Sequence, residues 1–149
     1  MRVAAILLTC LNDRAAAVMA GDFLACRSRV VAPFHLMTHR ESLSLSTDDD
    51  LREGFDSFCA LLKSQRVTDF IRLVGGAQLL DPGLIKGRFI THVIAGAMRF
   101  IDPFPSQMTL RRVDGRWRAT SVTNALAKSR WPLLMASPAK TDLRKGPEE

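Results

Sequence analysis

The stretch Leu110–Ala119, with the sequence LRRVDGRWRA, carries the clearest structural signal in the chain. Its Asp114-Gly115 pair lies between two alternating runs and is typical of a two-residue hairpin turn, because Asp and Gly tolerate the positive φ that both central positions need. The turn also sets the register of the two strands. The expected pairs are Val113 with Arg116, Arg112 with Trp117, Leu110 with Ala119 and Met108 with Ser121. Alternation then predicts a core face formed by Met108, Leu110, Trp117 and Ala119, and an outer face formed by Arg111, Arg116, Arg118 and Thr120.

Two further turn signals lie upstream, at Asp81-Pro82-Gly83 and at Asp102-Pro103-Phe104-Pro105. Proline removes a backbone donor and fixes φ, so neither segment is expected inside a strand. Gly83–Ile101 is predicted as one long strand and Val67–Leu80 as the strand before it. Between Val67 and Leu126 we therefore expect three long antiparallel strands joined by tight turns, which the earlier half of the chain covers.

The same register, carried back across the proline turn, predicts the two faces of Gly83–Ile101. The side chains expected to face the core are Phe89, Val93, Ala95, Ala97 and Arg99, and those expected on the opposite face are His92, Ile94, Met98 and Phe100. Both faces are largely apolar, which is typical of a strand that is covered on both sides. We expect the protein's own helices on one side and a second subunit on the other, in a homodimer formed through the sheet.

The N-terminal half predicts helices and one short hairpin. Met1–Ala20 is rich in Ala and Leu and is expected to be a helix that covers the sheet, although a secretory signal segment remains an alternative for it. Asp22 is the expected N-cap of a second helix that runs towards Val30 and ends at Pro33. The strands expected next are Phe34–Thr38 and Ser42–Ser46. A third helix follows, capped by Thr47 with Asp50, and its apolar stripe is Leu51, Phe55, Phe58 and Leu62.

Composition limits the protein class. A chain of 149 residues fits one domain, which we expect over residues 1–136, with a polar, disordered tail at 137–149. The hydrophobic share of 47% and the charged share of 24% are ordinary for a soluble protein, and we expect no membrane interaction. Cys10, Cys26 and Cys59 are odd in number and lack metal-ligand spacing. They favour a reduced, cytoplasmic protein with no metal site and no cofactor.

The hairpin Thr109–Arg118 resembles the terminal hairpin of the nuclear transport factor 2-like superfamily, and Ala20–Phe23 and Ala32–Phe34 resemble its second helix and first strand. The resemblance covers Leu11–Leu126. It implies an α+β fold in which a curved, mixed, mostly antiparallel sheet wraps around N-terminal helices as a cystatin-like cone. It also implies a pocket in the mouth of the cone and, commonly, a homodimer. Members include ketosteroid isomerases, polyketide cyclases, epoxide hydrolases and binding proteins, so the fold does not choose a function.

The ketosteroid isomerase pattern does not carry over to this chain. Those enzymes hold an oxyanion with a tyrosine and a protonated carboxylic acid and move a proton with a second carboxylate. The chain contains no tyrosine, and the strand before Asp114-Gly115 reads Ser106-Gln107-Met108-Thr109, without a carboxylate. Without these groups the oxyanion has no donors. Whether the protein is an enzyme stays open.

Other catalytic candidates are weak. An epoxide hydrolase-like site needs an arginine and two carboxylates, for which Arg99, Asp69 and Asp102 are available, but structural roles are the favoured explanation, since structural ion pairs are commoner than catalytic ones. His35 and His92 alternate with apolar neighbours and are candidates for an acid or base, while His39 is expected in an exposed turn. A half-buried, hydrogen-bonded histidine is the simpler interpretation of the first two.

The net charge of +6 and the arginines of the last hairpin permit an anionic partner, but no aromatic residue shares their face for base stacking, so we do not expect nucleic-acid binding. The leading hypothesis is a pocket for a small, mainly apolar ligand, with Arg99 as its polar group. The expected pocket residues are Phe34, Leu36, Phe55, Phe58, Phe89, Arg99, Met108 and Leu110. The alternatives are an enzyme of the isomerase, cyclase or hydrolase type and a protein-interaction module whose cone is filled by its own side chains.

Overall fold

The computed structural model describes residues 2–38, 42–96, 98–99 and 102–125. The expected tail at 137–149 and His39 lie outside these ranges. The helices are α1 (Val3–Ala20), α2 (Phe23–Arg27) and α3 (Asp48–Ser64). The strands are β1 (Val30–Met37), β2 (Ser42–Leu45), β3 (Asp69–Asp81), β4 (Leu84–Ala95), β5 (Met98–Arg99), β6 (Phe104–Val113) and β7 (Arg116–Asn124).

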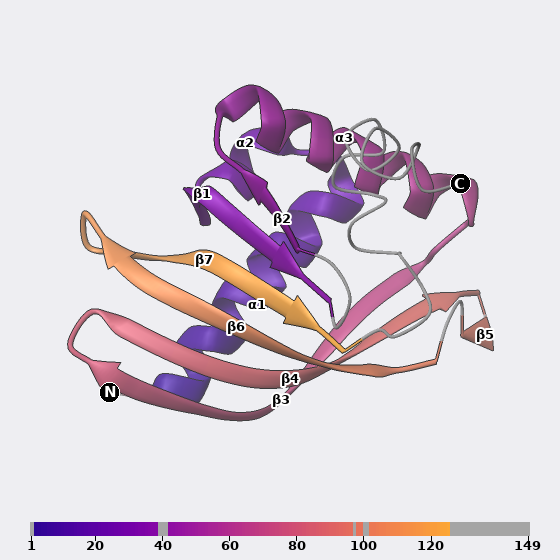
Figure 1. Cartoon of the computed structure of the whole chain (residues 1–149). Helices are drawn as coiled ribbons and strands as arrows, with labels where there is room; N and C mark the ends of the chain where they lie inside the picture. Colours follow the sequence, from indigo (N-terminus) through magenta and orange to yellow (C-terminus); the bar gives the residue numbers. More distant parts are fainter. Residues whose placement is uncertain (1, 39–41, 97, 100–101, 126–149) are drawn as a thin grey trace.

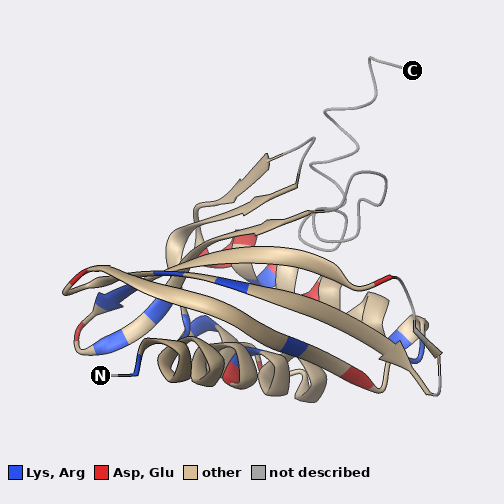
Figure 2. Ribbon diagram, turned by 90° about the horizontal axis from the view of Figure 1, so that it is seen from below, with Lys and Arg blue, Asp and Glu red and all other residues tan. Residues whose placement is uncertain are grey.

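The strands form one curved sheet in the order β2-β1-β7-β6-β4-β3, with β5 paired to β4 (Figure 1). Only the β1–β7 pair is parallel among the pairs of the described strands. The long strands curve around the helices, and α1 runs alongside them on their inner side (Figure 2). The predicted α+β fold with a mixed, mostly antiparallel sheet is therefore confirmed. Three long strands were expected from Val67 onwards, and the structure has four, β3, β4, β6 and β7, since the last hairpin contributes two of them.

The last hairpin confirms most of the predicted register. Asp114 and Gly115 form the turn, both with positive φ, and Val113 pairs with Arg116 and Leu110 with Ala119. The expected pairing of Met108 with Ser121 is wrong. An irregularity between Thr109 and Leu110 shifts the register, so that Met108 pairs with Val122. The core-face assignment still holds for the residues at the centre of the hairpin, because Met108, Leu110 and Ala119 are all buried.

Strand β4 is shorter than the predicted strand Gly83–Ile101. It ends at Ala95, where Gly96 takes a positive φ and the chain reverses into β5. Phe89 and Val93 lie on the buried face, as predicted, and His92 and Ile94 on the other. Beyond Ala95 the alternation no longer continues, because the backbone of Arg99 pairs with Ile94 in the opposite direction. The alternation of β4 ends before Arg99, so it no longer supports the predicted inner-face position of that residue.

The N-terminal half begins as predicted and then departs from the prediction. α1 forms and ends at Gly21, which is left-handed, and Asp22 accepts a hydrogen bond from the Ala25 amide at 3.1 Å. α2 ends at Arg27, so the expectation that it runs towards Val30 and stops at Pro33 is wrong. Pro33 lies inside β1, where the register with β7 shifts between Val30 and His35.

The core joins α1 to the inner face of the sheet. Leu7 and Leu11 of α1 are fully buried with Ile85 of β4 and Leu110 of β6. α1 is long and apolar enough to cross a membrane by length and composition, and in this fold it packs on β3 and on the neighbouring helices. The third helix is capped as expected, since the Asp50 amide donates to Thr47 Oγ1 at 3.0 Å. Together the helices and the sheet leave a space that is not filled by the core.

Candidate functional site

A cavity of about 110 Å³ lies between the helices and the inner face of the sheet. All three helices and most of the long strands contribute to its wall. Its apolar residues are Val18, Phe23, Val30, Phe34, Leu36, Leu45, Leu51, Phe55, Phe58, Phe70, Phe89, Phe104 and Val122. Its other lining residues are Arg14, Cys26, Arg27, Gly54, Arg72, Thr91 and Asn124. The cavity is therefore mainly aromatic and aliphatic, with a few polar groups, as small-molecule sites usually are.

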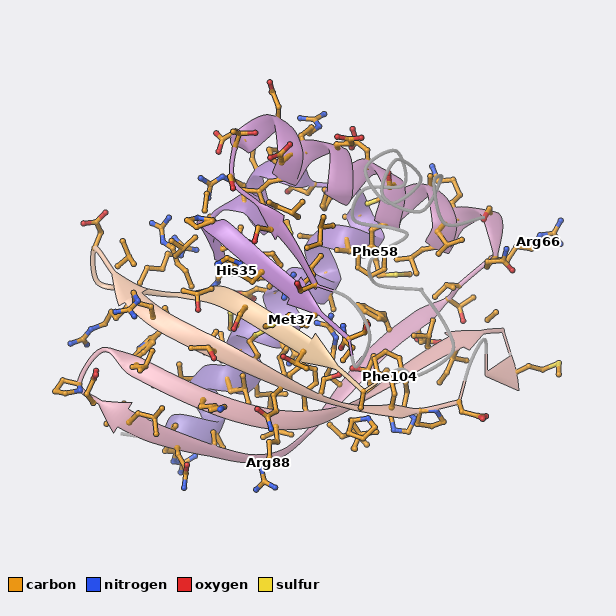
Figure 3. The ribbon with its side chains drawn as sticks, in the orientation of Figure 1. His35, Met37, Phe58, Arg66, Arg88 and Phe104 are labelled. Atoms are coloured by element: carbon orange, nitrogen blue, oxygen red, sulfur yellow. The ribbon has the colours of Figure 1, made fainter. Side chains whose placement is uncertain are left out.

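Edge-to-face aromatic contacts hold the wall formed by the helices. Phe23 of α2 meets Phe55 of α3 with ring centroids 5.5 Å apart, and Phe58 of α3 meets Phe70 of β3 at 5.4 Å. Such pairs favour defined ring orientations. Phe58 lies on the side of α3 that faces the sheet, and Phe104 lies on the sheet (Figure 3). The apolar wall is thus built from both layers of the fold.

A short polar chain lies on the sheet side. Ser106 Oγ donates to Asn124 Oδ1 at 2.6 Å, and the hydroxyl oxygens of Thr91 and Ser106 are 3.4 Å apart. All three residues are buried. Thr91 and Asn124 also line the cavity, so they can offer hydrogen bonds to a molecule inside it.

Three arginines line the cavity, and they differ in whether they have a counterion. Arg27 has one, because its Nε lies 2.9 Å from Asp48 Oδ1 and its Nη1 donates to the Val30 carbonyl at 2.9 Å. Neither Arg14 nor Arg72 forms an ion pair with a carboxylate of the described residues. Two cationic groups therefore face the cavity without an acid to neutralise them.

Arg72 enters the cavity from β3, with its guanidinium over the ring of Phe70 at 4.2 Å from the centroid. Its Nη1 reaches the Leu11 carbonyl only at 3.5 Å, and its Nε is buried without a hydrogen-bond partner among the described residues. Burial, and then the charge of Arg14, lower the pKa of Arg72 to about 9. The side chain still carries its charge at neutral pH.

Arg14 enters from α1, with its guanidinium 5.4 Å from the ring centroid of Phe34. Its Nε and Nη1 are both buried, and neither has a hydrogen-bond partner in the part of the chain that the structure describes. Buried donors are nearly always paired in folded proteins, so three unpaired nitrogens on two arginines of one cavity call for an explanation.

Five of the eight predicted pocket residues line this cavity, namely Phe34, Leu36, Phe55, Phe58 and Phe89. Met108 and Leu110 do not. They lie in the core with Leu7, at 1% and 0% exposure, because α1 covers that part of the sheet. The side chain of Arg99 lies outside the described part of the structure. Whether the five residues bind a ligand stays a prediction.

The three weak catalytic candidates lie away from the cavity wall. His35 Nδ1 is 2.8 Å from Ser44 Oγ on the neighbouring strand, and His92 lies on the outer face of β4. Asp69 is exposed and accepts a hydrogen bond from Thr68 Oγ1 at 3.0 Å. None of the three side chains therefore lines the cavity. Among the described residues no group of three His, Cys, Asp or Glu side chains could hold a metal ion.

Sequence reasoning missed the polar residues of the cavity, Arg14, Arg72 and Asn124. The alternation in β3 contains a usable signal, because Phe70 and Val74 face inward and Arg72 lies between them. Phe104 was missed for a different reason. It was expected in the proline turn, but it begins β6 and is 4% exposed.

Neither a protein-family sequence model nor a curated protein sequence matches the chain. Solved structures do match. A nuclear transport factor 2-like protein with a cystatin-like fold from Novosphingobium aromaticivorans superposes with a TM-score of 0.62 at 15% identity, covering 87% of this chain and 85% of that one. The chain has the nuclear transport factor 2-like fold. At this identity the similarity shows the fold alone.

Two further proteins with this fold show how little it says about activity. A nuclear transport factor 2-like protein of unknown function from Shewanella oneidensis has a TM-score of 0.61 at 12% identity, covering 82% of this chain and 98% of that one. A Shewanella frigidimarina protein provisionally described as a ketosteroid isomerase has a TM-score of 0.58 at 16% identity, covering 78% and 92%. The function of this nuclear transport factor 2-like chain has to be argued from its own cavity.

Proposed function

We propose that the protein binds a small, mainly apolar molecule in the cavity between the helices and the sheet. The observation that carries the proposal is the cavity itself, about 110 Å³ in volume and lined by seven phenylalanines. A space of this size is on the scale of one aromatic ring, since an engineered apolar cavity of about 150 Å³ binds benzene. Its ring-lined walls favour a flat apolar body.

Binding explains the lining better than catalysis does. A hydrolase or isomerase needs a titratable acid or base next to the reacting atoms. The described lining residues include no histidine, aspartate or glutamate, and the chain has no tyrosine. The charged side chains at the wall are arginines, which can donate several hydrogen bonds to a ligand.

The test is a substitution that fills part of the cavity. Leu36 lies on β1 at the cavity wall, so Leu36→Phe adds a ring to the space that the ligand needs. We expect the affinity for cinnamamide, a neutral ring compound, to fall about tenfold or more in isothermal titration calorimetry, because overfilling displaces the ligand. Leu79→Phe is the matched control, since Leu79 is 42% exposed and does not line the cavity. Equal binding by both variants would contradict a ligand site in this cavity.

The outer face of the sheet supports a second proposal, that the protein forms a homodimer through this face. Ile71 and Leu73 of β3 and Ile90 of β4 are 41%, 56% and 37% exposed, and Leu73 pairs directly with Ile90. The inner face is covered by the helices, while this apolar group has no cover from the described chain. A second copy of the sheet would bury it.

A further inference from the structure

We propose that the cavity takes a monocarboxylate with an apolar body about the size of one ring, and that Arg14 and Arg72 bind its carboxylate. The inference rests on the proposed function, because it assigns a chemical class to the ligand of the same cavity. It is carried by three buried guanidinium nitrogens, Nε and Nη1 of Arg14 and Nε of Arg72, that have no hydrogen-bond partner among the described residues.

Two other arginines near this site have the carboxylate partner that Arg14 and Arg72 lack among the described residues. Arg27 lines the same cavity and pairs with Asp48 at 2.9 Å, and Arg29 pairs with Asp13, whose oxygen lies 3.1 Å from the Arg29 Nε. The nearby acids are therefore already used by other arginines. The described chain supplies no carboxylate to Arg14 or Arg72, so an anionic group on the ligand would pair with both guanidinium groups.

Cys10 is one candidate for an internal counterion, because its thiol lies within range of the charges on Arg14 and Arg72. Burial, however, raises the pKa of the Cys10 thiol above its usual value, and this effect outweighs the attraction of the arginines. The thiol is therefore neutral at physiological pH and balances neither guanidinium.

The orientation of the two arginines suits a ligand. The guanidinium groups lie over phenylalanine rings, Arg72 over Phe70 and Arg14 over Phe34, at 4.2 and 5.4 Å from the centroids. A guanidinium that lies over a ring keeps the donors along its edge available for in-plane hydrogen bonds. Carboxylates match such donors well, and the rest of the lining is apolar. One anionic group on an apolar body satisfies both features.

The experiment compares cinnamate with cinnamamide, which have the same shape and differ in charge. Both are titrated calorimetrically into the full chain at pH 7. We expect cinnamate to bind about tenfold or more tightly, as charge-assisted hydrogen bonds to buried donors imply. Arg14→Met and Arg72→Met should each remove most of this preference, because methionine keeps the apolar stem and loses the donors that bind the carboxylate.

The control is Arg116→Met, which removes the same charge from an exposed position on β7. It should keep the preference for cinnamate, since only the net charge of the protein changes. Equal affinity of the wild-type protein for the two probes would overturn the carboxylate assignment and leave the cavity as an apolar binding site. Absence of binding by both probes would overturn the proposed ligand and the carboxylate assignment together. The wild-type comparison decides between these outcomes even if a variant does not fold.

Discussion

At the scale of single residues, the notable property of the site is a buried cation without a counterion among the described residues. Arg72 sits over Phe70 with its Nε buried and unpaired, and Arg14 adds a second positive charge. A buried polar group without a hydrogen bond lowers the stability of the folded protein, and a charged one lowers it more. Residues kept in such an arrangement are typical of binding sites, where function and stability conflict.

We therefore expect Arg72→Met to be more stable than the wild-type protein. The substitution removes the unpaired donors and keeps an apolar stem against Phe70 and Phe89. The melting temperature without ligand should rise by at least about 3 °C, which corresponds to about 1 kcal/mol for a domain of this size. A melting temperature at or below that of the wild type would show that the contact with Phe70 outweighs the missing hydrogen bonds.

The pH dependence of this difference follows from the pKa of Arg72. The pKa is about 9 in the folded protein, well below the ordinary value of an arginine, so the unfolded chain holds the proton more tightly. The wild-type protein therefore gains stability from this group as the pH rises above about 9. The advantage of Arg72→Met should be largest at pH 7 and smaller at pH 10.5, while the difference between Arg116→Met and the wild type should not change in this way.

At the scale of the elements, the contact between α1 and the sheet depends on a glycine. A Cβ atom at Gly87 would lie 2.2 Å from Leu7 Cδ2, and Leu7 is fully buried. Gly87 therefore lets α1 approach β4 closely.

Gly87→Ala should accordingly lower the free energy of unfolding by about 1–3 kcal/mol, the usual effect of overpacking. Urea denaturation measures the change. Gly75→Ala is the matched control, since its nearest neighbour would be the Arg88 carbonyl at an ordinary 3.7 Å. In the background of Leu7→Ala the effect of Gly87→Ala should largely disappear, and a persistent effect would place the clash elsewhere.

The sequence predicted the elements whose signals are local. The Asp114-Gly115 turn, the Asp22 and Thr47 caps and the stripe of α3 depend on residues within a few positions of one another, and the structure contains them all. It did not predict the shift of register near Thr120 or the reversal at Gly96, because both depend on how distant strands curve against the helices.

The candidate site was predicted in part, for the same reason. Phe34, Leu36 and Phe55 follow from periodicity within one strand or helix, and they line the cavity. Arg14 and Arg72 are 58 positions apart and come together only when α1 packs on β3. No local pattern distinguishes them from the many solvent-exposed arginines of the chain, several of which gather towards the β6–β7 turn (Figure 2).

At the scale of the whole molecule, the outer face of the sheet decides the expected assembly. Leu73 lies on β3, the edge strand of the sheet, paired with Ile90, and Arg88 projects away from the helices on the same strand as Ile90 (Figure 3). If two sheets pack through this face, a charge at Leu73 would be buried without a partner.

Leu73→Lys should therefore convert a dimer into a monomer in size-exclusion chromatography with light scattering. Leu24→Lys is the matched control, because Leu24 is also strongly exposed, at 76%, and lies on α2 away from the sheet. A wild-type protein that is monomeric at high micromolar concentration would contradict the dimer, and so would a Leu73→Lys variant of unchanged mass.

The parallel pairing of β1 with β7 has a consequence for how the chain is made. Val30 pairs with Ala119, and the Arg29 guanidinium donates to the Trp117 carbonyl across 88 positions of sequence. During synthesis β1 therefore emerges from the ribosome long before its parallel neighbour exists. The edge of β1 that pairs with β7 stays open until Asn124 has been added, which exposes the nascent chain to premature association and makes the last hairpin the step that closes the fold.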